Sequence, residues 1–244
     1  MKKITILNIP FVDINQKEFV SHLDQHVEAQ EKAFIVTANP EVVMKAKKDT
    51  DFMHILQQAT YITADGIGIV KASEMLGTPL PGRVTGYDTA IALLQIANQK
   101  HYKIYLLGAA EETLNKTVHN IQVQYPNIEI TGYHHGFFDW DHNGIAEDIA
   151  EQQPDIIFVA LGVPRQERWI AENFAAMRKG VFIGVGGTFD VIAGTVKRAP
   201  NIWIKLNIEW LYRLLSQPSR LIRMLDLPKF VWRVFREKRK RRKS

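Results

Sequence analysis

The sequence predicts an α/β protein built on a mostly parallel sheet, with a basic helical appendage at its C-terminus. Two observations indicate the sheet: short apolar runs alternate with helix-length segments, and several of these runs are apolar throughout. Such alternation is typical of α/β domains, and solidly apolar strands are typical of parallel sheets that helices cover on both faces. A third observation, the crowding of Lys and Arg near the end of the chain, indicates the appendage.

The expected elements follow in order along the chain. Strands are expected at residues 4–7, 34–37, 61–64, 104–107, 156–161 and 181–185. Helices are expected at residues 16–29, 40–59, 88–100, 111–125, 143–152 and 165–178. Asn15, followed three residues later by Glu18, resembles a capping box that opens the first helix. This order predicts a Rossmann-like fold with helices on both faces of the sheet.

Composition excludes several classes of protein. The chain has 244 residues, of which 46% are hydrophobic and 23% charged, and it contains no cysteine. These values exclude a disordered chain, a disulfide scaffold, a thiolate metal site and a cysteine nucleophile. The apolar run near the start is too short for a secretory signal, and no run of eighteen apolar residues occurs. We therefore expect a cytoplasmic protein without a transmembrane helix.

Charge divides the chain into two parts. Residues 201–244 hold thirteen Lys and Arg against three acids, whereas residues 1–200 hold 18 basic and 23 acidic side chains. A basic terminal segment on a mildly acidic body indicates an anionic partner for that segment. We therefore expect an α/β catalytic domain at 1–200 and a helical, membrane-associating appendage with a basic tail at 201–244.

The appendage has the composition of an interfacial membrane segment. Tryptophans and leucines interleave with cations, and Pro218 and Pro228 are expected to divide the segment into two or three short helices. Residues 238–244 are almost all cationic and are expected to be disordered. Each cation near an anionic leaflet contributes on the order of 1 kcal/mol, so the segment could hold the protein at a membrane. Its tryptophans could also support a homo-oligomer where no membrane is present.

Small and polar residues follow the expected strands. In open α/β sheets ligands bind beyond the carboxyl ends of the strands. The loops that would meet there are residues 37–41, 64–68, 108–110, 162–167 and 184–190. Within them, Asp65 ends an apolar strand and precedes Gly66, so it is a candidate general base. The alternative from position alone is that Asp65 caps the next helix.

The glycines of the last loop leave two interpretations open. Gly184, Gly186 and Gly187 follow an apolar strand as in a phosphate-binding turn, but Phe189 breaks the G-x-G-x-x-G register. That break disfavours a nucleotide-dependent oxidoreductase, and the absence of a G-x-x-x-x-G-K-[ST] motif excludes a P-loop NTPase. A nucleoside-diphosphate cradle and a tight turn without a ligand both remain.

The sequence offers no convincing metal site. Asp139 and Asp141 resemble the D-x-D of metal-dependent sugar-nucleotide transferases and the start of an EF-hand loop. The twelfth position of such a loop is Ala150 instead of Glu, so the calcium site fails. An acidic turn before the helix expected near Asn143 is the simpler interpretation. The adjacent His134 and His135 would point to opposite faces of a strand and could not easily share a metal.

Together these motifs resemble one family, the WecG/TagA/CpsF glycosyltransferases, over about residues 34–225. The segments that carry the resemblance are Thr37-Ala-Asn39-Pro40-Glu41, Asp65-Gly66-Ile-Gly68, Arg83-Val-Thr85-Gly86-Tyr-Asp88, Gly162-Val-Pro164-Arg-Gln166-Glu167, Gly184-Val-Gly186-Gly187-Thr-Phe189-Asp190, Gly194 with Arg198-Ala199-Pro200, and Glu209-Trp210-Leu-Tyr-Arg213 followed by Pro218-Ser-Arg220-Leu-Ile-Arg223. Any one motif is weak, whereas seven in the family's order are specific.

The resemblance implies roles for individual residues. Asp65 would be the base that takes the proton from the acceptor hydroxyl, and three appendage arginines would neutralise a diphosphate. The residues with implied catalytic roles are Asp65, Arg213, Arg220 and Arg223. The residues expected to bind substrate are Thr37, Asn39, Arg83, Gln166, Gly186, Gly187 and Asp190. The family is understood to work without a metal or other cofactor.

The resemblance also implies a reaction. Within the family, the chain is most similar to the enzymes that act in wall teichoic acid synthesis. These transfer N-acetylmannosamine from its UDP conjugate to the 4-hydroxyl of N-acetylglucosamine-diphospho-undecaprenol, with inversion to a β-1,4 linkage. The implied partners are a UDP-sugar, an undecaprenyl-diphosphate acceptor and the inner face of the membrane. UDP-N-acetylmannosaminuronic acid remains an alternative donor. A nucleic-acid-binding protein is a distant rival, because it would leave the strand-end motifs unexplained.

Overall fold

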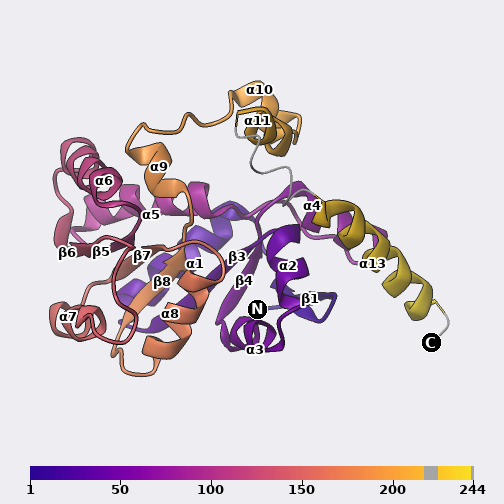
Figure 1. The fold of residues 1–244 in the computed structure, drawn as a ribbon, viewed down its shortest axis with the longest axis horizontal. Coiled ribbons are helices and arrows are strands. Elements are labelled where there is room, and N and C mark those ends of the chain that lie inside the picture. Colours follow the sequence, from indigo (N-terminus) through magenta and orange to yellow (C-terminus); the bar gives the residue numbers. More distant parts are fainter. Residues whose placement is uncertain (217–224, 243–244) are drawn as a thin grey trace.

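The computed structural model of the chain describes residues 1–216 and 225–242, and it confirms the α/β class (Figure 1). Its main sheet has six parallel strands in the order β4-β3-β8-β7-β5-β6. Their bounds are β3 Lys32–Ala38, β4 Tyr61–Ala64, β5 Lys103–Gly108, β6 Glu129–His134, β7 Ile156–Ala160 and β8 Gly180–Gly184.

Helices cover both faces of this sheet, as predicted. Alternate residues of β3 show the division, because Phe34 and Val36 belong to one apolar cluster and Ala33 and Ile35 to the other. The first cluster includes residues of α2 Pro40–Ala46, α3 Thr50–Gln58, α4 Ile67–Met75, α7 Ile145–Gln152 and α8 Arg165–Phe174. The second includes residues of α1 Gln16–Glu28, α5 Gly86–Lys100, α6 Glu111–Gln124 and α9 Thr188–Ile192.

The first expected strand lies outside the main sheet. β1 (Lys3–Ile6) pairs antiparallel with β2 (Ile9–Val12), which the sequence analysis did not predict. Leu7 and Asn8 join them with positive φ angles of 49° and 68°. Two residues in this conformation form a hairpin turn, whereas a parallel pairing needs a much longer crossover.

Three other elements differ from the expectation. The single helix expected at 40–59 is two helices, because Asp49 accepts a hydrogen bond from Phe52 N at 2.9 Å and begins α3 anew. The sequence analysis did not predict helix α4 or strand β6. Strand β6 is an edge strand without an apolar run, so the pattern used for the other strands does not mark it. The cap at Asn15 is confirmed: its Oδ1 accepts from Glu18 N at 3.0 Å.

The C-terminal segment forms helices α10 (Asn201–Lys205), α11 (Glu209–Ser216) and α13 (Asp226–Arg241). Pro228 does not break α13, because it lies in the first turn, where a backbone N–H is not needed. The expected disorder of residues 238–244 is wrong for the described part, since α13 continues to Arg241. Residues 243–244 and Pro218 lie outside the described residues. Glu237 accepts from Leu7 N at 2.9 Å and binds Arg241, which also donates to Thr5 O.

Helix α13 packs against the body of the protein. Phe230 and Val234 are 2% and 1% exposed and belong to the same apolar cluster as α2 and α4. Trp232 and Phe235, on the other side of the helix, are 60% and 52% exposed. The appendage predicted to begin at residue 201 therefore shares part of its core with the α/β body. Within residues 1–216 and 225–242, none of the helices combines the length and apolar character that a bilayer span requires.

We predict that Phe230→Ala lowers the free energy of unfolding by about 3–5 kcal/mol, because it leaves a cavity between α13 and the body. Phe235→Ala, on the exposed side of the same helix, is the control and should change it by less than about 0.5 kcal/mol. Urea unfolding measures both. Equally small effects would mean that α13 is not docked.

Candidate active site

A cavity of about 360 Å³ lies at the carboxyl ends of β3, β4 and β8. Its floor comes from the loops that follow these strands, and one side comes from the first turn of α5. Asn207, Glu209, Trp210 and Tyr212 of the appendage form another side. The cavity is thus built from segments that are distant in sequence and meet at the sheet edge where ligands bind in α/β folds.

The structure brings five of the predicted substrate and catalytic residues together in this cavity. They are Asn39, Asp65, Arg83, Gly187 and Asp190. Asn39 follows β3 directly, Asp65 follows β4, and Gly187 and Asp190 follow β8. The parallel pairing of these three strands explains their meeting, because it places the three strand ends side by side.

Asp65 is held at the cavity by its backbone. Its N–H donates to Ala38 O at 3.0 Å, so the chain stays beside β3 for one residue beyond the strand. The side chain is half-buried. The next helix has Gly66 as its N-cap, with φ +129° and no side-chain cap. The N-cap position of this helix is therefore Gly66 and not Asp65.

The start of α2 lies against the start of α4. A Cβ at Gly68 would lie 2.7 Å from Pro40 Cγ, so only glycine permits this approach. Asn39 caps α2, since its Oδ1 accepts from Val42 N at 3.0 Å. Because the cap uses the oxygen, the amide NH2 of Asn39 is the group that can donate to a ligand. The close packing keeps this donor near Asp65.

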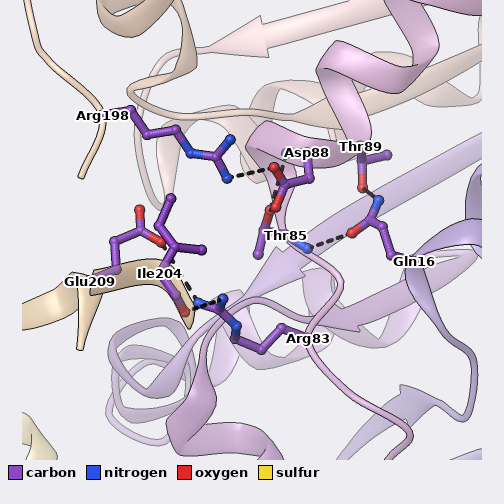
Figure 2. Close-up of polar contacts among 8 residues, drawn as sticks. All are labelled: Gln16, Arg83, Thr85, Asp88, Thr89, Arg198, Ile204 and Glu209. Carbon is purple, nitrogen blue, oxygen red and sulfur yellow. Dashed lines mark hydrogen bonds and ion pairs between the residues drawn. The ribbon is translucent and has the colours of Figure 1, made fainter. Parts of the chain in front are cut away.

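Arg83 connects the body to the appendage (Figure 2). Its Nη2 donates to Ile204 O at 3.3 Å, and its Nη1 lies 3.7 Å from Glu209 Oε2. The Arg83 and Glu209 side chains are 19% and 14% exposed. Arg83 therefore lines the cavity and also holds the appendage wall in place.

Thr37, Gln166 and Gly186 are not among the described residues that line the cavity. Thr37 Oγ1 donates to Gly184 O at 3.1 Å, and Gln166 Oε1 accepts from Gly186 N at 3.2 Å. Gly186 has φ +50°, a conformation that favours glycine. These three residues shape the glycine loop that contributes Gly187 to the cavity.

Glu167 supports the same loop and was not predicted as a site residue. It is 1% exposed, and its Oε1 accepts from Gln166 Nε2 at 2.8 Å. Burial raises the pKa of Glu167 to about 7, and the hydrogen bond from Gln166 and the charge of Lys45 only partly oppose this. Its place in the Gly162–Glu167 motif was the signal available in the sequence.

The three appendage arginines cannot be placed around the cavity. Arg220 and Arg223 lie outside the described residues, and so does the side chain of Arg213. The described part of the cavity wall holds four acids and three bases, which are Glu41, Asp65, Asp190, Glu209, Arg83, Lys197 and Arg198. The roles of the three appendage arginines therefore remain predictions.

Tyr87, Lys197 and Arg198 line the cavity but were not predicted as site residues. Tyr87 lies in the motif around Thr85 and Arg198 in the motif before Pro200, yet neither position had an implied role. Tyr87 lies in the first turn of α5, and Arg198 in the segment between α9 and α10. Only the fold brings the two segments together.

The acidic D-x-D segment forms a turn away from this cavity. Asp139 Oδ1 accepts from Asp141 N, and Asn143 Oδ1 accepts from Ile145 N at the start of α7, both at 3.0 Å. This supports the simpler interpretation of an acidic turn before a helix. Within the part of the chain that the structure describes, no group of three or more His, Asp or Glu side chains is placed to hold a metal ion.

Comparison with known proteins agrees with the motifs. Residues 4–244 match the glycosyl transferase WecG/TagA/CpsF family. Among the relatives are proteins of three species that are named N-acetylglucosaminyldiphosphoundecaprenol N-acetyl-beta-D-mannosaminyltransferase. The Bacillus subtilis (strain 168) protein is 41% identical over 99% of this chain and 94% of its own length. The Bacillus spizizenii protein is 40% identical over 98% of this chain and 93% of its own length. The Staphylococcus aureus (strain MW2) protein is 38% identical over 99% of this chain and 96% of its own length.

We predict a stability signature for Glu167. Its pKa is about 7 in the folded state and near 4.5 when unfolded, so the folded state alone keeps the proton between these values. Stability should therefore fall by roughly 2 kcal/mol as pH rises from 5 to 7. Urea unfolding at pH 5–8 measures the free energy of unfolding at each pH, and Glu167→Gln should remove this decrease with pH. Glu172→Gln, at an exposed site on the same helix, should keep it. Parallel curves for wild type and Glu167→Gln would contradict the prediction.

Proposed function

The chain belongs to the WecG/TagA/CpsF family of glycosyltransferases, and on that premise we propose the reaction of its cavity. The enzyme transfers N-acetylmannosamine from UDP-N-acetylmannosamine to the 4-hydroxyl of N-acetylglucosamine-diphospho-undecaprenol. The transfer inverts the anomeric centre to a β-1,4 linkage, an early step of wall teichoic acid linkage-unit synthesis. The observation that carries this proposal is the shared name of the relatives, which are 38–41% identical over nearly the whole chain.

Asp65 is the general base of this reaction. Inversion requires the acceptor hydroxyl to attack the anomeric carbon from the face opposite the departing UDP. A carboxylate that takes the hydroxyl proton during the attack lowers the barrier. The half-buried position of Asp65 on the cavity wall, next to the amide of Asn39, supports this role.

Cations must stabilise the departing UDP. The described wall of the cavity has more acids than bases, and a bound diphosphate adds further negative charge. Arg213, Arg220 and Arg223 provide the additional cations, and the reaction proceeds without a metal. Arginine suits this role because its planar fork binds phosphate oxygens in a bidentate way. Asp190, with Gly186 and Gly187, lies on the nucleotide side, and Thr37 and Gln166 act by shaping the loop.

The protein works at the inner face of the cell membrane, where its lipid-linked acceptor lies. Among the residues that the structure describes, most of the exposed large apolar side chains belong to the C-terminal segment, namely Ile202, Leu206, Trp210, Leu215, Leu225, Val231, Trp232 and Phe235. Figure 1 shows α10 and α11 together beyond α9, and α13 beside α4. Apolar side chains among many cations are suited to an anionic lipid surface.

Transfer is tested with purified protein, the lipid-linked acceptor, UDP-N-acetylmannosamine and excess EDTA. Wild type should release UDP, and Asp65→Asn should lower kcat more than about a hundredfold, because the amide cannot accept the proton. The control is Asp139→Asn in the surface turn, which should keep full activity. Wild-type turnover by Asp65→Asn would exclude it as the base. If the enzyme is active only with UDP-N-acetylmannosaminuronic acid, that sugar nucleotide is the donor. If no UDP-sugar supports UDP release, the proposed function is wrong.

Membrane association is tested by co-sedimentation with vesicles that contain anionic phospholipid. The double variant Trp232→Ala/Phe235→Ala should bind at least about tenfold more weakly, since both side chains lose apolar burial in the interface. Val123→Ala, at an exposed position on α6, is the control and should bind like wild type. Vesicle binding that is unchanged in the double variant would exclude α13 as the contact.

A further inference from the structure

We propose that Arg198 is a substrate-binding residue, and that its guanidinium binds a diphosphate group in the cavity. The inference rests on the proposed function, in which both substrates carry a diphosphate. It assigns a role to a side chain that the sequence motifs left without one.

Two groups in the first turn of α5, the Asp88 carboxylate and the Tyr87 ring, hold Arg198 in place. Figure 2 shows the contact with Asp88. Arg198 Nη2 donates to Asp88 Oδ1 at 2.6 Å. The guanidinium carbon also lies over the Tyr87 ring, 4.3 Å from its centre. Tyr87 and Arg198 both line the cavity, so the cation is fixed at the wall and not on a distant surface.

The carboxylate that holds Arg198 is itself fixed. Thr85 caps α5: its Oγ1 accepts from Asp88 N at 3.1 Å and donates to Asp88 Oδ2 at 2.8 Å. Gln16 Oε1 accepts from Thr85 N at 3.1 Å, and Gln16 Nε2 donates to Thr89 Oγ1 at 2.9 Å. The chain of contacts runs from α1 through α5 to Arg198. A cation held in this way loses little conformational freedom when a ligand binds.

Arg198 keeps unused hydrogen-bonding capacity. A guanidinium has five N–H donors, and Asp88 takes one of them. Within residues 1–216 and 225–242, the buried Nε of Arg198 has no hydrogen-bond partner. The side chain is 31% exposed, so part of the guanidinium remains open to the cavity. An anion on the open side of the fork would use the exposed donors of the two Nη groups.

The two other cations of the described wall are less suited to this role. Arg83 is occupied by Ile204 O and Glu209 of the appendage. Lys197 carries a single ammonium group, which binds phosphate as a point charge and not as a fork. Arg198 thus combines a fixed position, an open edge and the geometry that matches phosphate oxygens.

The test uses the full-length variants Arg198→Gln and Arg198→Lys. Calorimetry measures the Kd of UDP without acceptor, and steady-state assays with vesicles measure the KM of each substrate. We expect Arg198→Gln to lower kcat/KM at least about a hundredfold, and Arg198→Lys to recover little of it, because an ammonium cannot form the bidentate contact. If the diphosphate is that of the donor, the Kd of UDP rises at least tenfold. If it is that of the lipid, the KM of the acceptor rises and the Kd of UDP is unchanged.

Control variants separate binding from structure. Asp88→Asn removes the charge that holds Arg198 but keeps the guanidinium, so it should weaken binding less than Arg198→Gln. Lys179→Gln breaks a part-buried ion pair with Asp155 away from the cavity and should lower the Tm without changing the Kd or KM. If Arg198→Gln lowers only the Tm, or leaves the Kd and both KM values within twofold of wild type, the inference is wrong. A wild-type protein that neither binds UDP nor transfers sugar would instead overturn the proposed function.

Discussion

The parallel pairing of β3 with β4 and β8 is the constraint on which the rest of the site depends. Ala38 of β3 pairs with Ala64 of β4, and Asn39 and Asp65 are the residues that follow them in the sequence. β8, on the other side of β3, ends at the glycine loop. Because parallel strands end at the same edge, backbone hydrogen bonds between the strands bring a carboxylate, an amide and the glycine loop together.

Polar side chains that do not line the cavity stabilise the glycine loop after β8. Gln166 holds Gly186 N, and the buried Glu167 holds Gln166. A carboxyl buried to this degree costs stability when it is ionised. In return, the contacts of Glu167 and Gln166 hold the glycine loop in one conformation, whereas such a loop otherwise has many accessible conformations.

The C-terminal segment contacts the α/β body at two places around the cavity. Helix α13 packs with Phe230 on α2 and α4, which begin beside Asn39 and Asp65. Helices α10 and α11 close the cavity through the contacts of Arg83 with Ile204 and Glu209. A change in the position of the segment would therefore act on both the floor and the wall of the cavity.

The sequence by itself determined the α/β class, the cap at Asn15, the importance of the strand-end loops and the family, because these depend on local pattern and on short motifs. Only the tertiary structure decided that β1 forms a hairpin, that Gln166 shapes a loop and that α13 is part of the core. It also decided that Arg198 meets Asp88 and Tyr87, which lie 110 residues or more away along the chain. Such contacts depend on how strands are ordered across a sheet, and hydrophobic periodicity carries no record of that order.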